Sequence, residues 1–228
     1  MIRTFKGIGV WLLLCVSLIM GWGVAWAWSA EEVIEGIQRR YQEIKDLQAD
    51  FRQETTLPMM DRVNEATGRL YLKIPGKMRW DYFGKQKKTF VINDQTMWFY
   101  EPLERQVTIT DLSRLPNSHE LLSFLTGMGD LKRDFLLEGS GPLQETREGF
   151  LVVQLRPKTQ GSQWTHLRLV VDPKTFQVVQ SAFEGVQGER TVIDYDNIRT
   201  HQGLPDELFT FQIPEGVEVL HYPPRDEK

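Results

Sequence analysis

Cysteine is almost absent from this chain of 228 residues. The single one, Cys15, lies in the apolar N-terminal stretch, and Leu14 precedes it where a lipid-attachment site requires a small residue. We therefore expect no lipidation at Cys15. Once the N-terminal stretch is removed, the chain can form no disulfide and has no thiol for chemistry. Its stability must come from a hydrophobic core, which about 200 residues are sufficient to build in one domain.

Signatures of catalysis are also missing. The sequence contains no Gly-x-x-x-x-Gly-Lys-Ser/Thr, no Gly-x-Gly-x-x-Gly and no Gly-x-Ser-x-Gly, the motifs of phosphate, dinucleotide and acyl-transfer sites. Its four histidines are scattered, and His119-Glu120 lacks the second histidine that a zinc protease carries on the same helix face. These absences predict a protein that is not an enzyme and that uses neither a metal nor a cofactor. A hydrolase without a known motif stays open as an alternative.

Positive charge is not in excess. The chain carries 27 basic and 31 acidic side chains, and the loss of Arg3 and Lys6 with the N-terminal stretch leaves 25 against 31, a net charge of −6. An acidic chain of this kind is not expected to bind nucleic acid or an anionic membrane. The basic run at residues 85–88 coincides with a predicted turn, and we interpret it as a solvated loop tip.

The N-terminal stretch has the layout of an export signal. Two basic residues precede an apolar run over residues 8–27, and the sequence Ala-Trp-Ala at 25–27 places small residues where a signal peptidase reads them. We predict cleavage after Ala27, with Ala30 as the alternative site. The competing interpretation is an uncleaved membrane anchor, because the run approaches the length that spans a bilayer. Residues 28–228 are predicted to form a single domain.

The most informative stretch spans residues 68–110, where apolar and polar residues alternate in successive runs. This period of two predicts strands with two chemically different faces, and turn sequences such as Pro75-Gly76 between the runs predict an antiparallel meander. The stretch is rich in aromatic residues, which stand at positions 80, 82, 83, 90, 98, 99 and 100. Core packing is the first interpretation of these rings. Because residues 98–100 place rings on both faces of one strand, they also require a covering layer or a ligand.

A helix is predicted before this stretch, over residues 29–51. Ser29 can cap its N-terminus, and Glu31 and Glu32 suit the positive end of the helix dipole. One apolar stripe recurs at spacings of three and four residues, formed by Val33, Ile37, Tyr41, Ile44 and Leu47. Such a helix must lie on an apolar surface, and the sheet is the obvious candidate. A strand is predicted to begin within residues 49–55.

The second half of the chain predicts a short helix followed by more strands. The helix is expected over residues 119–127, with Leu121, Leu122, Phe124 and Leu125 as its apolar residues. Further strands are expected at residues 150–155, 166–171, 176–183, 190–198 and 208–211. Because no repeat or linker interrupts the sequence, one domain of antiparallel strands with two helical segments is the simplest layout.

Several segments resemble the LolA family, the periplasmic carriers of outer-membrane lipoproteins. Residues 68–80 are similar to a Gly-x-Leu-x-x-Lys-x-Pro-x-x-x-x-Trp hairpin, and residues 91–102 are similar to a segment that ends in Leu-Trp-Phe-Tyr-x-Pro. Residues 47–53 resemble the exit from the first helix, and residues 209–217 resemble a closing Phe-x-Phe-x-x-Pro-x-Gly-Val. These segments keep their order and span most of the chain after residue 27.

The resemblance implies a mainly β fold of the α+β class. A strongly curved antiparallel sheet would form an incomplete barrel, covered by the N-terminal amphipathic helix and by the short internal helix as a lid. It also implies that the aromatic stretch faces acyl chains rather than only a core. Combined with the alternation, it predicts that the acyl-chain cavity is lined by Ile37, Tyr41, Ile44, Leu70, Leu72, Met78, Trp80, Phe90, Ile92, Trp98, Tyr100, Leu122 and Phe124.

The resemblance further implies a function without catalysis. The protein would take acylated lipoproteins from an inner-membrane lipoprotein-releasing ABC transporter, cross the periplasm as a monomer and deliver them to the outer-membrane receptor LolB or an equivalent. A periplasmic binding protein for another lipid or apolar ligand is the alternative on the same fold. One departure concerns the lid: the family's Lys-Arg-Pro triplet, whose arginine helps to hold the lid, is Lys73-Ile74-Pro75 here. Arg69 and Arg79 are left as candidates for that contact.

Overall fold

The computed structural model describes residues 28–114, 130–139, 143–159 and 161–223. Thirteen strands in these residues form one sheet. The strands are β1 (Asp46–Leu57), β2 (Arg62–Lys73), β3 (Lys77–Tyr82), β4 (Lys88–Asn93), β5 (Thr96–Glu101), β6 (Gln106–Asp111), β7 (Phe135–Glu138), β8 (Gln144–Glu145), β9 (Leu151–Pro157), β10 (Trp164–Val171), β11 (Val178–Gly185), β12 (Arg190–Thr200) and β13 (Glu218–Tyr222). The helices are α1 (Ala30–Glu43) and α3 (Leu131–Asp134), with short 3-10 turns η1 (Pro58–Met60), η2 (Gly84–Gln86), η3 (Leu112–Arg114) and η4 (Asp206–Phe209).

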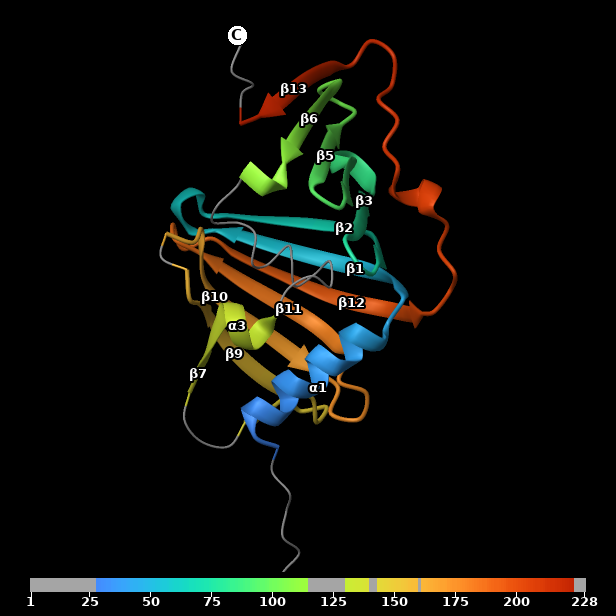
Figure 1. Ribbon diagram of the computed structural model, residues 1–228. Helices are drawn as coiled ribbons and strands as arrows, with labels where there is room; N and C mark the ends of the chain where they lie inside the picture. The colour runs from blue at the N-terminus through green and yellow to red at the C-terminus, as the bar shows by residue number, and fades with distance from the viewer. Residues whose placement is uncertain (1–27, 115–129, 140–142, 160, 224–228) are drawn as a thin grey trace, which may run out of the picture.

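The sheet is an open, curved wall. Its strand order is β13-β6-β5-β4-β3-β2-β1-β12-β11-β10-β9-β7, with β8 paired to β9. Every pair is antiparallel except β13 with β6, which is parallel. In the part of the chain that is described, the two end strands β13 and β7 do not pair, so the wall does not close on itself (Figure 1). The predicted α+β fold with an incomplete barrel is confirmed.

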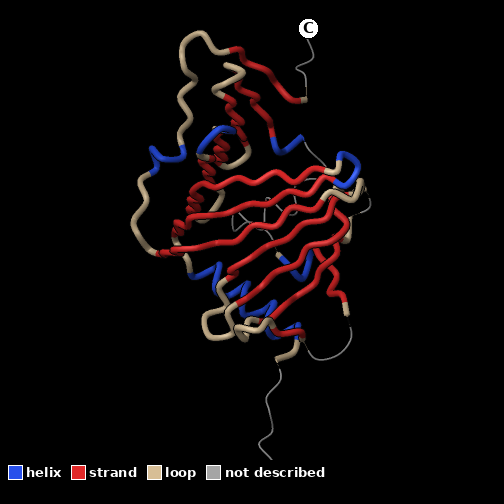
Figure 2. The backbone as a smooth tube through the Cα atoms, turned by 180° about the vertical axis from the view of Figure 1, so that it is seen from behind, coloured by secondary structure: helices blue, strands red, loops and turns tan. Residues whose placement is uncertain are grey.

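The two described helices lie on one face of this wall. Figure 1 shows α1 and α3 in front of the lower strands β9 to β12, and Figure 2 shows the bare opposite face of those strands, with α1 behind them. We call the helix-bearing face the inner face. The predicted lid helix at residues 119–127 falls outside the described residues, as does the predicted signal peptide.

Helix α1 begins as predicted and ends earlier than predicted. The Ser29 side chain accepts from the Glu32 amide, and the Glu32 carboxylate accepts from the Ser29 amide, which completes a capping box. The helix ends at Glu43, and Ile44 is already extended, so the prediction of a helix to residue 51 is wrong. Leu47 fits a period of three and four but also a period of two. Leu47 lies in a strand, in keeping with the period of two, because β1 pairs with β2 on one side and with β12 on the other.

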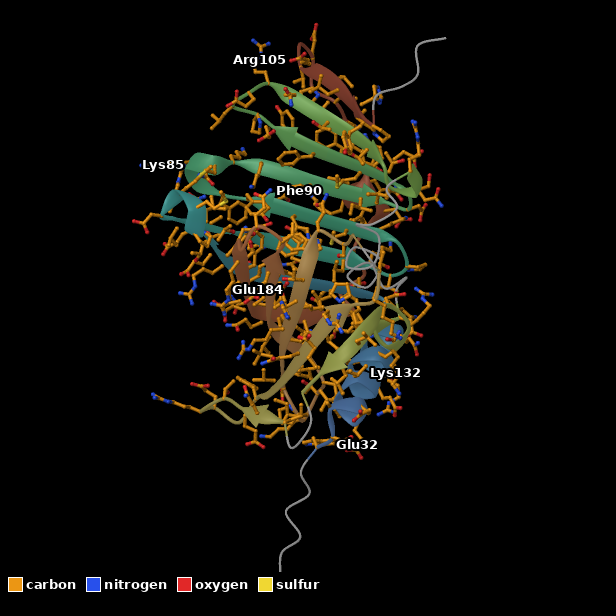
Figure 3. The ribbon with its side chains drawn as sticks, turned by 90° about the vertical axis from the view of Figure 1, so that its left-hand side faces the viewer. Glu32, Lys85, Phe90, Arg105, Lys132 and Glu184 are labelled. Atoms are coloured by element: carbon orange, nitrogen blue, oxygen red, sulfur yellow. The ribbon has the colours of Figure 1, made fainter. Side chains whose placement is uncertain are left out.

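Helix α1 is tied to its neighbours through residues 35–38. A Cβ at Gly36 would lie 2.2 Å from the Phe176 ring, so only glycine allows the helix to lie this close to the loop before β11. The Lys132 side chain forms an ion pair with Glu35, and Figure 3 shows Lys132 beside α1. The Gln38 side chain accepts from the amide of Leu131 at 3.1 Å. Helix α3 therefore ties the start of β7 to α1.

The chain after β12 crosses the outer face of the sheet. Arg79 donates to the backbone oxygen of Leu208 at 3.1 Å, Lys73 and Lys77 both pair with Asp206, and the Phe209 ring is fully buried. The strand predicted at residues 208–211 is wrong, because η4 ends at Phe209 and the residues after it are not in a strand. The apolar residues among 208–211 suggested a strand. Their side chains pack on the outer face of the sheet instead, and their backbone is not part of a strand.

Replacing Gly68 by alanine is expected to destabilise the protein by about 2 kcal/mol, because the added methyl group overpacks the sheet. A Cβ at this position would lie 2.2 Å from the Asp81 backbone oxygen and 2.5 Å from Cζ of Phe51, and backbone in a paired strand cannot move away cheaply. Urea denaturation measures the loss. The neighbouring Thr67→Ala, on an exposed side chain, is the control. Equal stability of the two variants would contradict this account of the strand packing.

Candidate functional site

A small hollow lies between α1 and the inner face of the sheet. Its volume is about 20 Å³, close to the minimum that one water molecule needs. Its wall is formed by Tyr41, Leu47, Ala49, Leu70, Leu72, Leu167, Leu169, Gln177, Val178, Ser181, Phe183, Tyr195 and Ile198. The wall is mainly aliphatic, and side chains from the protein itself fill most of the space in this state.

The strands around the hollow present their apolar residues to the inner face by simple alternation. Leu70 lies opposite Ala49 on β1 and opposite Trp80 on β3, so these three side chains share the inner face. The Trp80 ring meets the Phe51 ring edge-on, with 4.7 Å between the ring centroids. An aromatic cluster therefore continues the apolar wall from the hollow toward β4.

Four polar side chains interrupt the apolar wall of the hollow, namely Tyr41, Gln177, Ser181 and Tyr195. The hydroxyl groups of Ser181 and Tyr195 are 2.8 Å apart. The Gln177 side chain lines the hollow with Tyr41, and its amide nitrogen donates to the backbone oxygen of Val178 at 3.4 Å. Gln177 is 9% exposed and Ser181 is 2% exposed, so a polar group left alone at this place would lack water as a substitute partner.

Burial makes these phenols weak acids. It raises the pKa of Tyr195 to about 12, and it also raises the pKa values of Tyr41 and Tyr82. The hydroxyl of Tyr82 donates to the side-chain oxygen of Gln53 at 2.8 Å. All three phenols therefore stay neutral at physiological pH, and the hollow carries no charge on its tyrosines.

We expect the protein to lose stability as the pH rises above about 10. In the unfolded chain tyrosine ionises near pH 10, whereas Tyr195 keeps its proton in the folded chain up to about pH 12. Across that window the unfolded state binds fewer protons than the folded state, so the free energy of unfolding falls with rising pH. Tyr195→Phe should reduce the fall by up to about 1.4 kcal/mol per pH unit.

Urea denaturation at a series of alkaline pH values measures this slope. Tyr222, which is 56% exposed, supplies the matched control, because Tyr222→Phe removes a phenol that water already solvates. Parallel stability curves for wild type and Tyr195→Phe would refute the expectation.

Eight of the thirteen predicted cavity residues lie in the core of the inner face. Tyr41, Leu70 and Leu72 line the hollow itself. The others are buried in the same hydrophobic cluster, namely Ile37, Ile44, Met78, Trp80 and Ile92. Phe90 is half-buried and packs against that cluster, with its ring stacked on Phe99 at 4.3 Å. Figure 3 labels Phe90 on its strand.

Two predicted cavity residues lie on the wrong face. Trp98 is opposite Val91, whereas Phe99 is opposite Phe90, so Trp98 and Tyr100 belong to the outer face. The Tyr100 ring contacts Phe211, which follows η4. All four residues from 97 to 100 are apolar or aromatic, so the strand has no polar face that would indicate its orientation. The last two predicted residues, Leu122 and Phe124, lie outside the described residues.

More than half of the wall was not predicted. It comes from β10, β11, β12 and the residue before β11, and includes Leu167, Leu169, Val178, Phe183 and Ile198. The alternation of these segments predicted strands, but nothing local shows that they meet β1 and β2. Pairing of β1 with β12 brings them there.

Neither arginine considered for the lid contact faces the hollow. Arg69 pairs with Asp50 at 2.9 Å, and Arg79 pairs with Asp81 at 2.8 Å. Leu70 and Trp80 point inward, so their neighbours Arg69 and Arg79 point to the outer face. In this structure both guanidinium groups are engaged away from α1.

No group of three or more histidine, cysteine, aspartate or glutamate side chains in the described residues is arranged to hold a metal ion. No helix within these residues is long and apolar enough to cross a membrane. The hollow and its aromatic extension, with their apolar lining, form the candidate site.

An open, curved sheet with an apolar inner face partly covered by a helix is typical of proteins that shelter apolar ligands. That architecture defines the class to which this protein belongs. The sequence of residues 42–212 matches the family described as outer membrane lipoprotein carrier protein LolA. The chain belongs to that family.

Individual relatives agree with the family match. The outer-membrane lipoprotein carrier protein of Methylococcus capsulatus is 32% identical over 178 residues, which cover 77% of this chain and 81% of the relative. The protein of the same name from Azotobacter vinelandii is 30% identical over 202 residues, which cover 86% and 94%. Among solved structures, an uncharacterized conserved protein from Thermus thermophilus has a TM-score of 0.52 at 16% identity, covering 85% of this chain and 99% of that one. The last similarity is one of fold.

Proposed function

We propose that this protein is a periplasmic carrier of outer-membrane lipoproteins. It takes lipoproteins released from the inner membrane, shelters their acyl chains against the inner face of the sheet and delivers them to the outer membrane. The observation that carries the proposal is the apolar hollow under α1 in a chain of the LolA family. A family of carriers implies a role without catalysis, and the inner face offers packing surface rather than reactive groups.

In this carrier the inner face of the sheet can contact either the acyl chain or its own covering helix, and the balance between these two apolar contacts sets the affinity. Each methylene of an acyl chain that leaves water contributes about 0.8 kcal/mol, so an uncovered chain is strongly unfavourable in the periplasm. The hollow of about 20 Å³ cannot accept such a chain as it stands. Helix α1 must therefore move away from the sheet to admit an acyl chain. The apolar residues of the helix and the acyl chain then compete for the same inner face. This competition weakens net binding and permits release.

We propose that the acyl chains lie along the inner-face residues of β2, β3 and β4 and beside α1. The proposed contact residues are Ile37, Tyr41, Ile44, Leu70, Leu72, Met78, Trp80, Phe90 and Ile92. Leu122 and Phe124 complete the set as residues of the predicted lid. These assignments are supported by the burial of the described members in one cluster or against it.

The remaining parts of the proposal concern export and partners. Cleavage after Ala27 would release residues 28–228 as one monomeric domain into the periplasm. The donor would be the inner-membrane ABC transporter that releases lipoproteins, and the acceptor would be LolB or an equivalent receptor. These assignments rest on the family and on the layout of the N-terminal sequence.

A release assay tests the function. Spheroplasts that hold newly made lipoproteins are incubated with the purified protein, and the soluble fraction is probed for one lipoprotein and for its variant that lacks the acylated cysteine. The carrier should release the acylated protein into a soluble complex and should not bind the unacylated one. Recovery of free lipid without any lipoprotein would favour the alternative of a general lipid-binding protein.

A further inference from the structure

A basic pocket lies on the side of α1 that faces the loop between β10 and β11, and Figure 1 shows this loop beside the helix. The pocket has a volume of about 320 Å³, which is in the size range of sites for small ligands. The helix contributes Arg39, Arg40 and Glu43 to its wall, and the loop contributes Lys174 and Thr175. Three of these five side chains carry a positive charge and one carries a negative charge.

The two walls of the basic pocket are held together by the protein itself. The Phe176 ring packs so closely on α1 that a Cβ at Gly36 would lie 2.2 Å from it, and both residues line the pocket. The Asp172 carboxylate accepts from the backbone amide of Lys174 and from the hydroxyl of Thr175, each at 2.9 Å. The loop therefore presents Lys174 and Thr175 in a fixed arrangement, and the pocket exists without any movement of α1.

The positive charges of the basic pocket are not neutralised by ion pairs within the described residues. None of Arg39, Arg40 and Lys174 forms such a pair there, and Glu35, one turn before Arg39, pairs with Lys132 instead. The Nε atom of Arg40 is buried and has no hydrogen-bond partner in that part of the chain. The helix dipole favours a cation in the last turn, which accounts for the charge of Arg40 but not for its unpaired N–H. A buried donor without an acceptor is unfavourable, so the pocket favours an incoming acceptor.

We propose that the basic pocket binds the phosphate group of a phosphate ester, with Arg40 as the main contact. A phosphate group offers negative charge and several acceptor oxygens, and a guanidinium group donates to two such oxygens at once. Arg39 and Lys174 add positive charge, whereas the Glu43 carboxylate in the same wall opposes an anion. Three positive charges against one negative charge leave an excess of two. This inference goes beyond the proposed function, which requires no phosphate site.

The position of the basic pocket beside the hollow favours a lipid as the source of the phosphate. Arg40 lines the pocket, and its neighbour Tyr41 lines the hollow. The loop is divided in the same way, because Phe176 lines the pocket and Gln177 lines the hollow. A glycerophospholipid with its acyl chains against the inner face can therefore place its phosphate in the pocket, whereas a soluble phosphate ester would contact the pocket alone. This choice of source rests on the proposed acyl-chain site, and the phosphate site itself does not.

Calorimetric titration with two probes tests the site. One probe is glycerophosphoglycerol, and the other is dihexanoylphosphatidylglycerol, which carries the same phosphate group with two short acyl chains. Arg40→Gln should weaken the binding of both probes about tenfold, the effect of one lost charge-assisted hydrogen bond. Arg105→Gln removes an exposed arginine at the far end of the molecule from α1 (Figure 3) and should leave both affinities unchanged. Failure of wild type to bind either probe, or equal affinities of wild type and Arg40→Gln, would overturn the site.

Two further variants change exposed side chains and so avoid a folding defect. Lys174→Gln should weaken the binding of both probes about threefold, and Glu43→Gln should strengthen it about threefold because the opposing charge is lost. Glu104→Gln removes another exposed carboxylate, outside the pocket, and should change neither affinity. Effects of the same sign in Lys174→Gln and Glu43→Gln would contradict an anion site.

The two probes also distinguish the sources of the phosphate. If the ligand is a phospholipid, the acylated probe should bind at least about tenfold more tightly than the soluble one, which the burial of about two methylenes supplies. Equal affinities would overturn the lipid as the source. Neither measurement depends on lipoproteins, so a protein that binds both probes and fails the release assay would retain the phosphate site and lose the proposed carrier function.

Discussion

Replacing Asp46 by alanine is expected to reduce the free energy of unfolding by about 3 kcal/mol. Asp46 is 4% exposed, and its carboxylate accepts from three successive backbone amides. These are Gln202 at 2.6 Å, Gly203 at 2.9 Å and Leu204 at 3.3 Å. Bonds to a charged acceptor are stronger than neutral ones, and their loss leaves amides unpaired where water has limited access.

The reason for this large effect is the place of Asp46 in the fold. It is the first residue of β1, at the centre of the sheet, and the three amides belong to the segment that leaves β12 for the outer face. The carboxylate therefore fixes the point at which the chain leaves β12 and turns toward the outer face. The conservative Asp46→Asn keeps one acceptor oxygen and should lose less stability.

Thermal and urea denaturation of both variants measure the effect, and hydrogen exchange at residues 202–204 reports it locally. Faster exchange confined to these amides would confirm the local cause. An alanine variant as stable as wild type would show that the three bonds contribute nothing net.

Replacing Trp80 by alanine is expected to cost about 4 kcal/mol, in the range found for large-to-small changes of buried aromatic residues. Trp80 is 6% exposed and lies among the rings of Phe51, Tyr82 and Tyr195, with centroids 4.7, 6.4 and 6.3 Å away. The surrounding strands are paired on both sides and cannot collapse into the space. A large cavity therefore persists.

Trp98→Ala is the matched control, because it removes the same side chain from the other face of the same meander. Trp98 is only half-buried, so its loss should cost about 1–2 kcal/mol. Circular dichroism during urea unfolding follows both variants without depending on tryptophan fluorescence. A larger loss from Trp98 than from Trp80 would mean that the register of β5 is the reverse of the one described.

The meander from β2 to β4 could be predicted because its information is local. Leu70, Leu72, Met78 and Trp80 alternate with polar residues, and short turns leave each strand no partner but its neighbour. The same reasoning failed for β5, where residues on both faces are apolar or aromatic. It also failed at Leu47, which satisfies the helical and the strand period equally.

The far wall of the hollow could not be predicted, although its strands could. Leu169 and Val178 stand in segments of recognisable strand character. The pairing of Phe51 with Tyr195 joins residues far apart along the chain, and no short-range pattern encodes that choice. The polar pair of the hollow, Ser181 with Tyr195, was missed for the same reason.

Short-range patterns in the chain are enough to establish the class of fold, the apolar character of the inner face and the absence of known catalytic motifs. Each of these follows from composition, from period-two alternation and from short motifs, which act over a few residues. The three-dimensional packing was needed to establish which residues surround the hollow, which face of β5 is turned inward and where Tyr41 enters. These depend on pairing between distant strands and on the seating of α1, and both are set by the packing of the whole core.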